Sequence, residues 1–479
     1  MSVAELVPGP KIHEKVSRDS MVQRGFMLVI ALYLVITLAF PLYAMLSKAF
    51  STYQFNLDQF SIQVSDENGN FNTPEMTMRA LNEQVSAFDS GDLAAKSGSR
   101  LAPTKLFPDF SFKSPILYRI SGNDETAVFL VGSERHVGTE VVELDSNTFR
   151  RVVIRPSKGT GISNFTRYFS TPALFRSIGN SVFIAVLSTI ITVSLAFWFA
   201  YALSRSCMKF KGFFRLVAMA PILVPSLLPG IALIYLFGNQ GILKAFLMGN
   251  SIYGPIGIVV GSVFFTFPHA MLIIGTALSI SDGRLYEAAT ALRASKWRTF
   301  WTVTIPSARY GLISAAFVVF NLVITDFGLP KVIGGQFNVL AVDIYKQVIG
   351  QQNFEMGAVV SVVLLLPAIL AFAIDRYNQK KQVAGLSARS IVFEPKPNAK
   401  SDTGWFIYCS FVTVFILGII GICQYAALVK FWPYDLSLSL NNYAFDKMDG
   451  GGWAAYSNSI KLGLLTAFFG TIIVFMGAY

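Results

Sequence analysis

Charged residues and cysteines are both scarce in this chain of 479 residues. Only 14% of the residues are charged, whereas soluble domains average about 25%. Hydrophobic residues make up 53%, and the mean hydropathy is +0.52. This composition excludes a soluble globular protein of this size and indicates an integral membrane protein. The cysteines are too few and too scattered for a disulfide framework; they are Cys207, Cys409 and Cys423.

Motifs for bond chemistry and metal binding are lacking as well. The three histidines, His13, His136 and His269, are scattered, and no cluster has metal-ligand spacing. The sequence has no glycine-rich loop followed by lysine of the kind that cradles nucleotide phosphates. We therefore expect no catalytic residue, no metal site and no cofactor bound by this chain. Any ATPase has to be a separate polypeptide.

Long apolar runs are abundant instead. A helix needs about 20 apolar residues to cross the hydrocarbon core of a bilayer. Five charge-free runs reach that length and three shorter ones complete a prediction of eight spans: 25–47, 177–204, 216–243, 245–281, 310–325, 356–374, 403–429 and 462–479. The first run is too long for a removable signal peptide and lacks a small-residue cleavage site, so we expect a retained span.

The basic residues indicate how these spans are oriented. With the N-terminus in the cytoplasm, the predicted cytoplasmic segments hold 19 basic and 8 acidic residues, and all other segments together hold 20 of each. The whole net charge of +11 then lies on one side, as the positive-inside rule predicts for this topology and no other. We therefore expect a multi-pass protein with a cytoplasmic N-terminus. The pI of 9.4 needs no nucleic-acid partner.

Two parts of the chain repeat one another. Three residue pairs recur in the same order and at one constant offset: Asn164-Phe165, Asn180-Ser181 and Ala200-Tyr201 return as Asn442-Tyr443, Asn458-Ser459 and Ala478-Tyr479. Each pair lies at the same place before or within a span, which predicts two parallel copies of one membrane unit. Asn180 and Asn458 are equally consistent with helix caps and with contacts between elements.

The two copies differ in length. More than 110 residues separate the first span from Asn164, but only about a dozen separate the corresponding span from Asn442. The first copy therefore contains an insertion of roughly 100 residues within 50–163, where apolar and polar residues alternate as in β-strands. We expect a small β-rich extracytoplasmic domain, which either elaborates packing and docking or contacts a ligand. The second copy stops after two of six spans, so we expect a fragment of a polypeptide about a third longer.

The polar segment 282–309 lies between apolar runs on the predicted cytoplasmic side. Four residues at helical spacing give a short helix one apolar face: Leu285, Ala288, Ala289 and Leu292. Large aromatic side chains here are costly to expose and are candidates to fill a groove in a partner: Tyr286, Trp297, Phe300 and Trp301. Glu287 suits the positive end of the helix dipole and can pair with a basic partner residue. The alternative is a helix that packs only on its own membrane domain.

Three prolines lie in the third predicted span. Pro221, Pro225 and Pro229 interrupt its hydrogen-bond ladder, which is tolerated at membrane depth where the freed groups face protein or water. The span is then either a bent helix that lines a translocation path or a kinked helix that only packs.

An ionisable residue, Asp326, interrupts the fifth apolar run. Such a group is costly unless it faces a cavity or a partner, and together with Gly328 it predicts a re-entrant outer gate. Lys331 and Lys346 are candidates to attract an anionic substrate, with ordinary interfacial anchors as the alternative.

The loop carries a recognisable pattern. EAA at 287–289, AS at 294–295, WR at 297–298, FW at 300–301 and VTIP at 303–306 resemble the EAA loop of permease subunits of binding-protein-dependent ABC importers. In that family the loop is a coupling helix that docks into the ATP-binding subunit. The resemblance implies an ATPase-coupling role for Tyr286, Glu287, Ala288, Ala289, Leu292, Arg293, Trp297 and Phe300. The family usually has Gly at position 293; Arg adopts a left-handed backbone only at a cost of roughly 1 kcal/mol, so we allow for a different turn and expect docking to be retained.

Most of the chain is similar to fused, two-copy permeases for ferric iron and 2-aminoethylphosphonate. Segments 164–181, 208–215 and 221–241 carry this resemblance, and segment 325–357 resembles the phosphonate branch more than the iron branch. The resemblance implies the all-α transmembrane ABC importer permease fold with a β-rich extracytoplasmic insert, located in the bacterial inner membrane. It also implies two partners: a cytoplasmic ABC ATPase dimer, which binds ATP and Mg, and a periplasmic substrate-binding protein.

The resulting organisation has six parts. They are a cytoplasmic tail at 1–24, a first span at 25–47, the extracytoplasmic insert at 48–165, a first permease core at 166–377 with the coupling loop 282–309, a cytoplasmic linker at 378–403, and the start of a second repeat at 404–479. A secondary transporter driven by an ion gradient would also explain repeats and broken helices, but it calls for paired intramembrane carboxylates, and only Asp326 is found. A non-transport scaffold or sensor is the third reading.

Overall fold

The computed structural model describes residues 18–54, the strands between 61 and 155, and residues 157–383, 391, 393–445 and 451–478. The chain divides into two compact units. One unit is residues 46–423, and the other combines residues 1–45 with residues 424–479.

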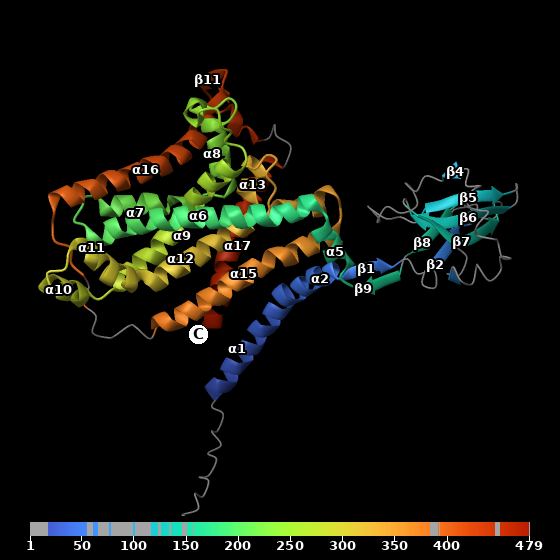
Figure 1. The fold of residues 1–479 in the computed structure, drawn as a ribbon, viewed down its shortest axis with the longest axis horizontal. Helices are drawn as coiled ribbons and strands as arrows, with labels where there is room; N and C mark the ends of the chain where they lie inside the picture. The colour runs from blue at the N-terminus through green and yellow to red at the C-terminus, as the bar shows by residue number, and fades with distance from the viewer. Residues whose placement is uncertain are drawn as a thin grey trace, which may run out of the picture. The chain divides into compact units, whose positions relative to one another are not determined.

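Helices long and apolar enough to cross a membrane dominate the described residues (Figure 1). An eighth candidate beside the seven single helices is the pair Lys211–Leu223 and Leu227–Phe237, which is bent by 104°. The all-α transmembrane class is thereby confirmed. The described residues give seven spans, or the predicted eight if the bent pair counts as one span. The orientation of the N-terminus stays a prediction. The single helices are Arg24–Ala49, Pro172–Arg205, Pro255–Ile280, Lys296–Thr325, Phe354–Tyr377, Ala399–Leu428 and Gly452–Ala478.

Four helices form the core of the larger unit: α6 (Pro172–Arg205), α9 (Pro255–Ile280), α12 (Ile305–Thr325) and α15 (Phe354–Val383). Helix α9 packs against α6 and α12, and α12 also packs against α15. Gly311 lets α12 approach α9 closely, because a Cβ at this position would lie 2.3 Å from the Cβ of Ala277. The buried hydroxyls of Thr192 and Thr266, 3.2 Å apart, join α6 to α9.

Helix α16 (Ala399–Leu428), the first helix of the second copy, packs on the same core. The Tyr408 hydroxyl donates to the carbonyl oxygen of Leu195 at 2.8 Å. The ring of Trp405 stacks on Trp198 with centroids 5.9 Å apart. Because the tyrosine hydroxyl finds an acceptor, its aromatic body can be buried without an unsatisfied polar group.

The three prolines break the third span as predicted. Pro221 lies in η3 (Ala220–Leu223), Pro225 lies in the gap that follows, and Pro229 lies in the first turn of α8 (Leu227–Phe237). A missing N–H is harmless at a helix start, because that group has no partner inside the helix. The preceding helix is α7 (Lys211–Met219), and η4 (Lys244–Leu247) follows α8.

Two short helices and a π-helical turn connect α12 to α15: α13 (Gly328–Ile333), α14 (Leu340–Tyr345) and η6 (Lys346–Gly350). Helix α13 packs against α8 and α9. Leu329 is fully buried there, and Cβ atoms at Gly230 and Gly261 would lie 3.0 and 2.6 Å from its Cδ1 atom. Glycines on two neighbouring helices therefore make room for the apolar side chain of α13.

The insert is β-rich, as predicted. A three-stranded sheet has the order β3-β2-β8 and a four-stranded sheet the order β4-β5-β6-β7, with every ladder antiparallel. The strands are β1 (Ser51–Gln54), β2 (Ser61–Ser65), β3 (Met76–Thr77), β4 (Ser99–Arg100), β5 (Ile116–Gly122), β6 (Thr126–Ser133), β7 (His136–Asp145), β8 (Arg151–Arg155) and β9 (Ser157–Thr160). Strand β1 pairs with β9, so along the sequence both sheets are inserted between the two strands of a hairpin.

The two copies close this hairpin in the same way. In the first copy the amide of Asn164 donates to the carbonyl oxygens of Ala49 and Ser51, at 3.1 and 2.8 Å. In the second copy Asn442, the counterpart of Asn164 in the repeat, donates to the carbonyl oxygens of Ala427 and Val429, at 3.2 and 2.8 Å. Only the length of chain between the amide and its acceptors differs, and the insert accounts for the extra length in the first copy, as the sequence predicts.

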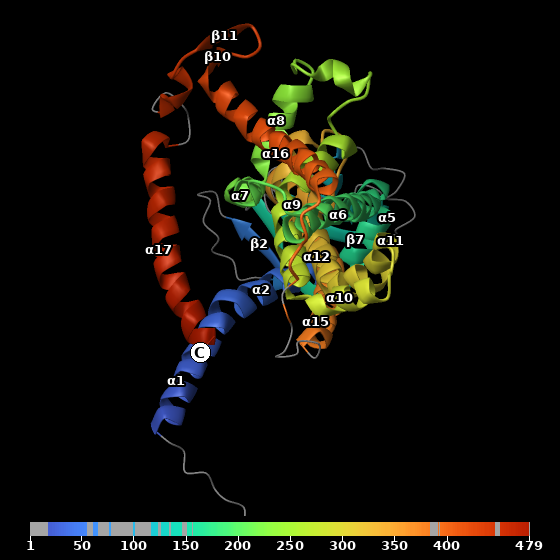
Figure 2. The ribbon, with the colours of Figure 1, turned by 90° about the vertical axis from the view of Figure 1, so that its left-hand side faces the viewer.

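The second copy of the hairpin belongs to the smaller unit. Its strands are β10 (Val429–Phe431) and β11 (Asp435–Leu438), followed by η7 (Asn441–Tyr443). Helix α17 (Gly452–Ala478) meets α1 (Arg18–Leu34) near its C-terminal end, where a Cβ at Gly477 would lie 3.9 Å from Ile30 (Figure 2). A π-helical turn, η1 (Val35–Ala39), connects α1 to α2 (Phe40–Ala49).

Candidate functional site

The coupling loop, residues 282–309, consists of α10 (Gly283–Ala291), α11 (Lys296–Thr299) and η5 (Phe300–Thr304). Helices α10 and α11 lie at one end of the bundle and α5 (Ser163–Ser170) lies at the other (Figure 1). The carboxylate of Asp282 accepts from the N–H of Arg284 at 3.0 Å, and the hydroxyl of Ser295 accepts from the N–H of Arg298 at 3.2 Å. Each short helix is therefore capped by its own sequence.

The predicted apolar face of α10 is divided. Ala289 is buried, whereas Ala288 and Glu287 are not. Leu285 is 50% exposed and Leu292 is 82% exposed. Within the described part of this chain the face is therefore covered almost fully at Ala289, by half at Leu285 and little at Leu292.

The aromatic side chains are divided in the same manner. Trp297 and Trp301 are 69% and 53% exposed. Phe300 instead packs into the core, where its ring stacks on Trp198 with centroids 5.4 Å apart. The hydroxyl of Tyr286 donates to the Thr304 hydroxyl at 3.1 Å. Tyr286 and Phe300 are thus anchors of the loop within this chain, and the docking role of the exposed residues stays a prediction.

Arg293 corrects our allowance for a different turn. Its φ is +52°, the left-handed conformation that glycine would adopt. Its N–H donates to the carbonyl oxygen of Thr290 at 3.0 Å, and the N–H of Ala294 donates to that of Ala289 at 2.9 Å. This pair of bonds is the Schellman motif at the end of α10. Two satisfied helical carbonyls offset the strain, so the turn is kept without glycine.

A second cluster lies in the gate segment, residues 326–346. The carboxylate of Asp326 accepts from the N–H groups of Gly328 and Leu329, both at 3.3 Å, and hydrogen-bonds the side chain of Ser226. Burial raises the pKa of Asp326, although these hydrogen bonds act to lower it. A Cβ at Gly328 would lie 2.5 Å from the Ser226 hydroxyl oxygen. Asp326 and Gly328 therefore meet the break of the third span beside Pro225.

The lysines of the gate segment have partners in this chain. The ammonium of Lys331 lies 4.4 Å from the ring centroid of Tyr345, and Lys346 donates to the side chain of Asn338. Asn180, inside α6, donates to the carbonyl oxygen of Asn338 at 2.9 Å, so it is a contact and not a helix cap. The roles of these residues toward a substrate stay predictions.

Two residues at the coupling loop were missed from the sequence. Arg205 ends α6, and its Cζ lies 4.9 Å from the ring centroid of Tyr286 and 4.6 Å from that of Phe393. In the sequence Arg205 is one of the 19 basic residues on the predicted cytoplasmic side, and Phe393 is the only aromatic residue of the linker 378–403. No periodicity connects positions so distant in sequence, so the contact required the fold.

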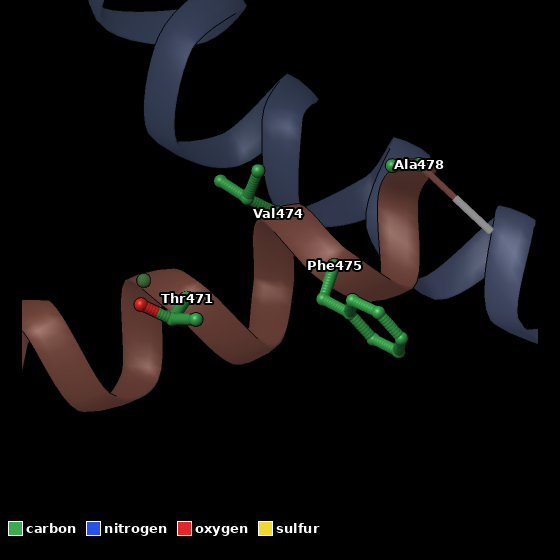
Figure 3. Close-up of a pocket in the computed structure, with 5 residues that line it drawn as sticks. Thr471, Val474, Phe475 and Ala478 are labelled. Atoms are coloured by element: carbon green, nitrogen blue, oxygen red, sulfur yellow. The ribbon is translucent and has the colours of Figure 1, made fainter.

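A hollow lies along helix α17. One face of the helix lines it, with Thr471, Val474, Phe475 and Ala478 at helical spacing (Figure 3). The lining offers one hydroxyl and no charge. It lacks the convergent polar groups of a solute site.

The chain matches the family described as "Binding-protein-dependent transport system inner membrane component" over residues 193–383, which contain the coupling loop and the gate segment. It is 27% identical over 322 residues to the ferric transport system permease protein FbpB of Actinobacillus pleuropneumoniae, covering 63% of this chain and 47% of that one. The chain spans about half the length of the ferric relatives it matches.

A shorter relative is covered almost completely. The molybdenum transport system permease protein ModB of Azotobacter vinelandii is 30% identical over 212 residues, which are 43% of this chain and 93% of that protein. A crystal structure of a bacterial alginate ABC transporter is similar at a TM-score of 0.39 and 14% identity, covering 48% of this chain and 85% of that one. The named relatives are permeases and not enzymes. The chain belongs to the family of binding-protein-dependent transport system inner membrane components.

Proposed function

We propose that the chain is the permease subunit of an ATP-driven ABC importer in the bacterial inner membrane, with its N-terminus in the cytoplasm. A substrate-loaded periplasmic protein docks outside, and a dimer of ATP-binding subunits drives the change between inward-facing and outward-facing states. ATP and Mg bind to that partner and not to this chain.

The observation that carries this proposal is the exposure of Leu292 and Trp297 at 82% and 69% on a loop that is anchored at both ends. Capping by Asp282 and packing of Phe300 fix the backbone of the loop, so the exposed side chains extend from a defined backbone position. A large apolar side chain held in water on a fixed scaffold is typical of a protein interface. An ATP-binding subunit that covers these side chains would transmit its movements to the membrane helices through α10.

Copurification in detergent tests the coupling role. The native chain should retain its ATP-binding subunit, and Glu287→Lys or Trp297→Ala should release it. Phe246→Ala is the matched control, because Phe246 is 75% exposed but lies in η4, on the predicted opposite side. Full ATP-driven uptake by both loop variants would overturn the assignment.

For the solute we propose 2-aminoethylphosphonate or a related phosphonate, on the resemblance of segment 325–357. The ferric relatives support ferric iron as a second candidate. Uptake of each labelled solute, in cells that lack their own system, separates the two. Accumulation that continues after ATP is exhausted, and stops when the ion gradient is collapsed, would indicate a secondary transporter instead.

A further inference from the structure

The linker between the two copies runs along the base of the coupling loop. We call Ile391 and residues 393–398 the linker strap. The carbonyl oxygen of Ile391 accepts from the N–H of Gly283 at 2.7 Å. The N–H of Ile391 donates at 3.4 Å to Oδ1 of Asp282, the carboxylate that caps α10. Both hydrogen-bonding groups of one strap residue are therefore committed to the first turn of the coupling helix.

Glycine at position 283 allows this close approach. A Cβ there would lie 3.1 Å from the carbonyl oxygen of Ile391 and 3.2 Å from the Cα of Phe393. Both neighbours are main-chain atoms, which cannot turn away as a side chain can. The main chains of α10 and the strap are thus in direct contact.

Arg205 joins the strap to the membrane helices. Its guanidinium lies against the rings of both Phe393 and Tyr286, whose centroids are 4.5 Å apart. Its Nη2 atom donates to the carbonyl oxygen of Leu278 at 2.8 Å and to the hydroxyl of Ser281, both at the end of α9. Guanidinium groups bind aromatic faces most strongly when partly desolvated, and Arg205 is half-buried. One side chain therefore contacts the end of α9, the coupling helix and the strap from its place at the end of α6.

The far end of the strap is fixed as well. The thiol of Cys207 donates to the carbonyl oxygen of Pro395 at 3.1 Å. The carboxylate of Asp402, in the first turn of α16, accepts from the N–H of Cys207 at 2.9 Å and from the N–H of Asn398 at 3.0 Å. The strap thus connects the coupling helix directly to the first helix of the second copy.

We propose that Phe393 is a positioning residue for energy coupling, which acts by clamping the strap and α10 together at the guanidinium of Arg205. The inference rests on the proposed function, in which α10 receives the movement of the ATP-binding subunit. Displacement of α10 then pulls on α6 and α9 through Arg205 and on α16 through the strap. A linker that only joined the two copies would not need both main-chain groups of Ile391 to hydrogen-bond to the first turn of the coupling helix.

The test is the number of solute molecules imported per ATP hydrolysed, in proteoliposomes with the ATP-binding subunits and the binding protein. Labelled 2-aminoethylphosphonate and ferric iron are the probes. Phe393→Ala should lower this ratio at least fivefold, with copurification of the ATP-binding subunit unchanged and ATP hydrolysis retained within twofold. Phe393→Tyr, which keeps an aromatic face, should restore the ratio. The matched control is Glu394→Ala, at the next position of the strap, which should leave it unchanged.

Each other result decides against the clamp. An unchanged ratio in Phe393→Ala would overturn it. So would loss of copurification or a large fall in melting temperature, because Phe393 would then only support the fold. Failure of the native chain to bind any ATP-binding subunit is a separate result, which overturns the proposed function itself.

Discussion

The coupling loop and the gate segment depart from ordinary burial in opposite directions. The coupling loop leaves Leu292 and Trp297 largely in solvent, although apolar side chains usually lie inside. In the gate segment only 4% of Asp343 is exposed and burial raises the pKa of Asp326, although carboxylates usually lie outside. Each departure has a cost, and the ways in which the two costs are met differ.

In the gate segment groups of the same chain meet most of this cost, although Oδ2 of Asp343 is buried without a hydrogen-bond partner among the described residues. Backbone N–H groups and Ser226 solvate Asp326. A hydrogen bond with Ser177 lowers the pKa of Asp343, against the larger effect of burial, which raises it. At the coupling loop nothing in the described chain covers Leu292. Substitutions in the coupling loop should therefore reduce transport and leave the stability of the protein unchanged. Substitutions in the gate segment should first reduce its stability.

The largest expected effect is on transport. Leu292→Asp should reduce ATP-driven uptake at least tenfold, because a carboxylate would enter the apolar contact that we propose with an ATP-binding subunit. The free energy of unfolding should change by no more than about 0.5 kcal/mol, as for other exposed positions. Uptake and melting temperature should be measured on the same preparation. Met248→Asp, at a position 90% exposed beyond α8, is the control. A large loss of stability in Leu292→Asp would show that the loop is covered by its own chain.

The next effect reverses this pattern at the gate. Asp326→Ala removes the acceptor for two N–H groups and a hydroxyl, which should destabilise the protein by about 2 kcal/mol. Asp326→Asn should cost about half as much. Burial raises the pKa of Asp326 and so disfavours its charge, and a neutral acceptor of the same shape keeps one oxygen. Thermal unfolding in detergent measures both. Equal losses for the two variants would show that the charge, rather than the capping geometry, is what the site requires.

Much of the fold was predictable because a membrane span depends on average composition over about 20 residues rather than on any single contact. The length of the insert was predictable from the repeat, because more than 110 residues separate the first span from Asn164 and only about a dozen separate the corresponding span from Asn442. The structure agrees, since the two asparagines make the same hydrogen bonds to acceptors at very different separations along the chain. Its strands followed from alternation. The sequence did not predict that the insert lies between two paired strands, β1 and β9. Ser51 and Thr160 are far apart in the sequence, and only the structure shows that they pair.

The candidate sites were less predictable. Helical periodicity places Leu285, Ala289 and Leu292 on one face but does not say how much of that face the same chain covers. Propensity argued against a left-handed Arg293, and two hydrogen bonds at the helix end outweighed it. The contact of Arg205 with Phe393 depends on where a loop crosses a helix end, which no local pattern encodes.

A smaller gain in stability is expected at the end of the coupling helix. Arg293→Gly relieves a left-handed backbone that costs an L-residue about 1–2 kcal/mol, and the flexibility of glycine in the unfolded chain offsets about half of this. The net gain in the free energy of unfolding should be up to about 1 kcal/mol, measured by thermal unfolding. Arg293→Ala keeps the strain and is the control. If both variants gained equally, removal of the charge rather than relief of the backbone would be the cause.

The smallest effect concerns the lysine of the gate segment. The ammonium of Lys331 lies over the ring of Tyr345, which also contacts Phe327 at 5.1 Å between centroids. Tyr345→Leu should cost about 0.5 kcal/mol of cation–π attraction, whereas Tyr345→Phe keeps the ring and should cost less. If Lys331 serves only as an anchor, the KM for labelled 2-aminoethylphosphonate should be the same in both variants. If the KM changes in Tyr345→Leu alone, where the ammonium has lost its aromatic partner, Lys331 acts on the solute. Residues of the gate segment would then serve function as well as stability, as those of the coupling loop do.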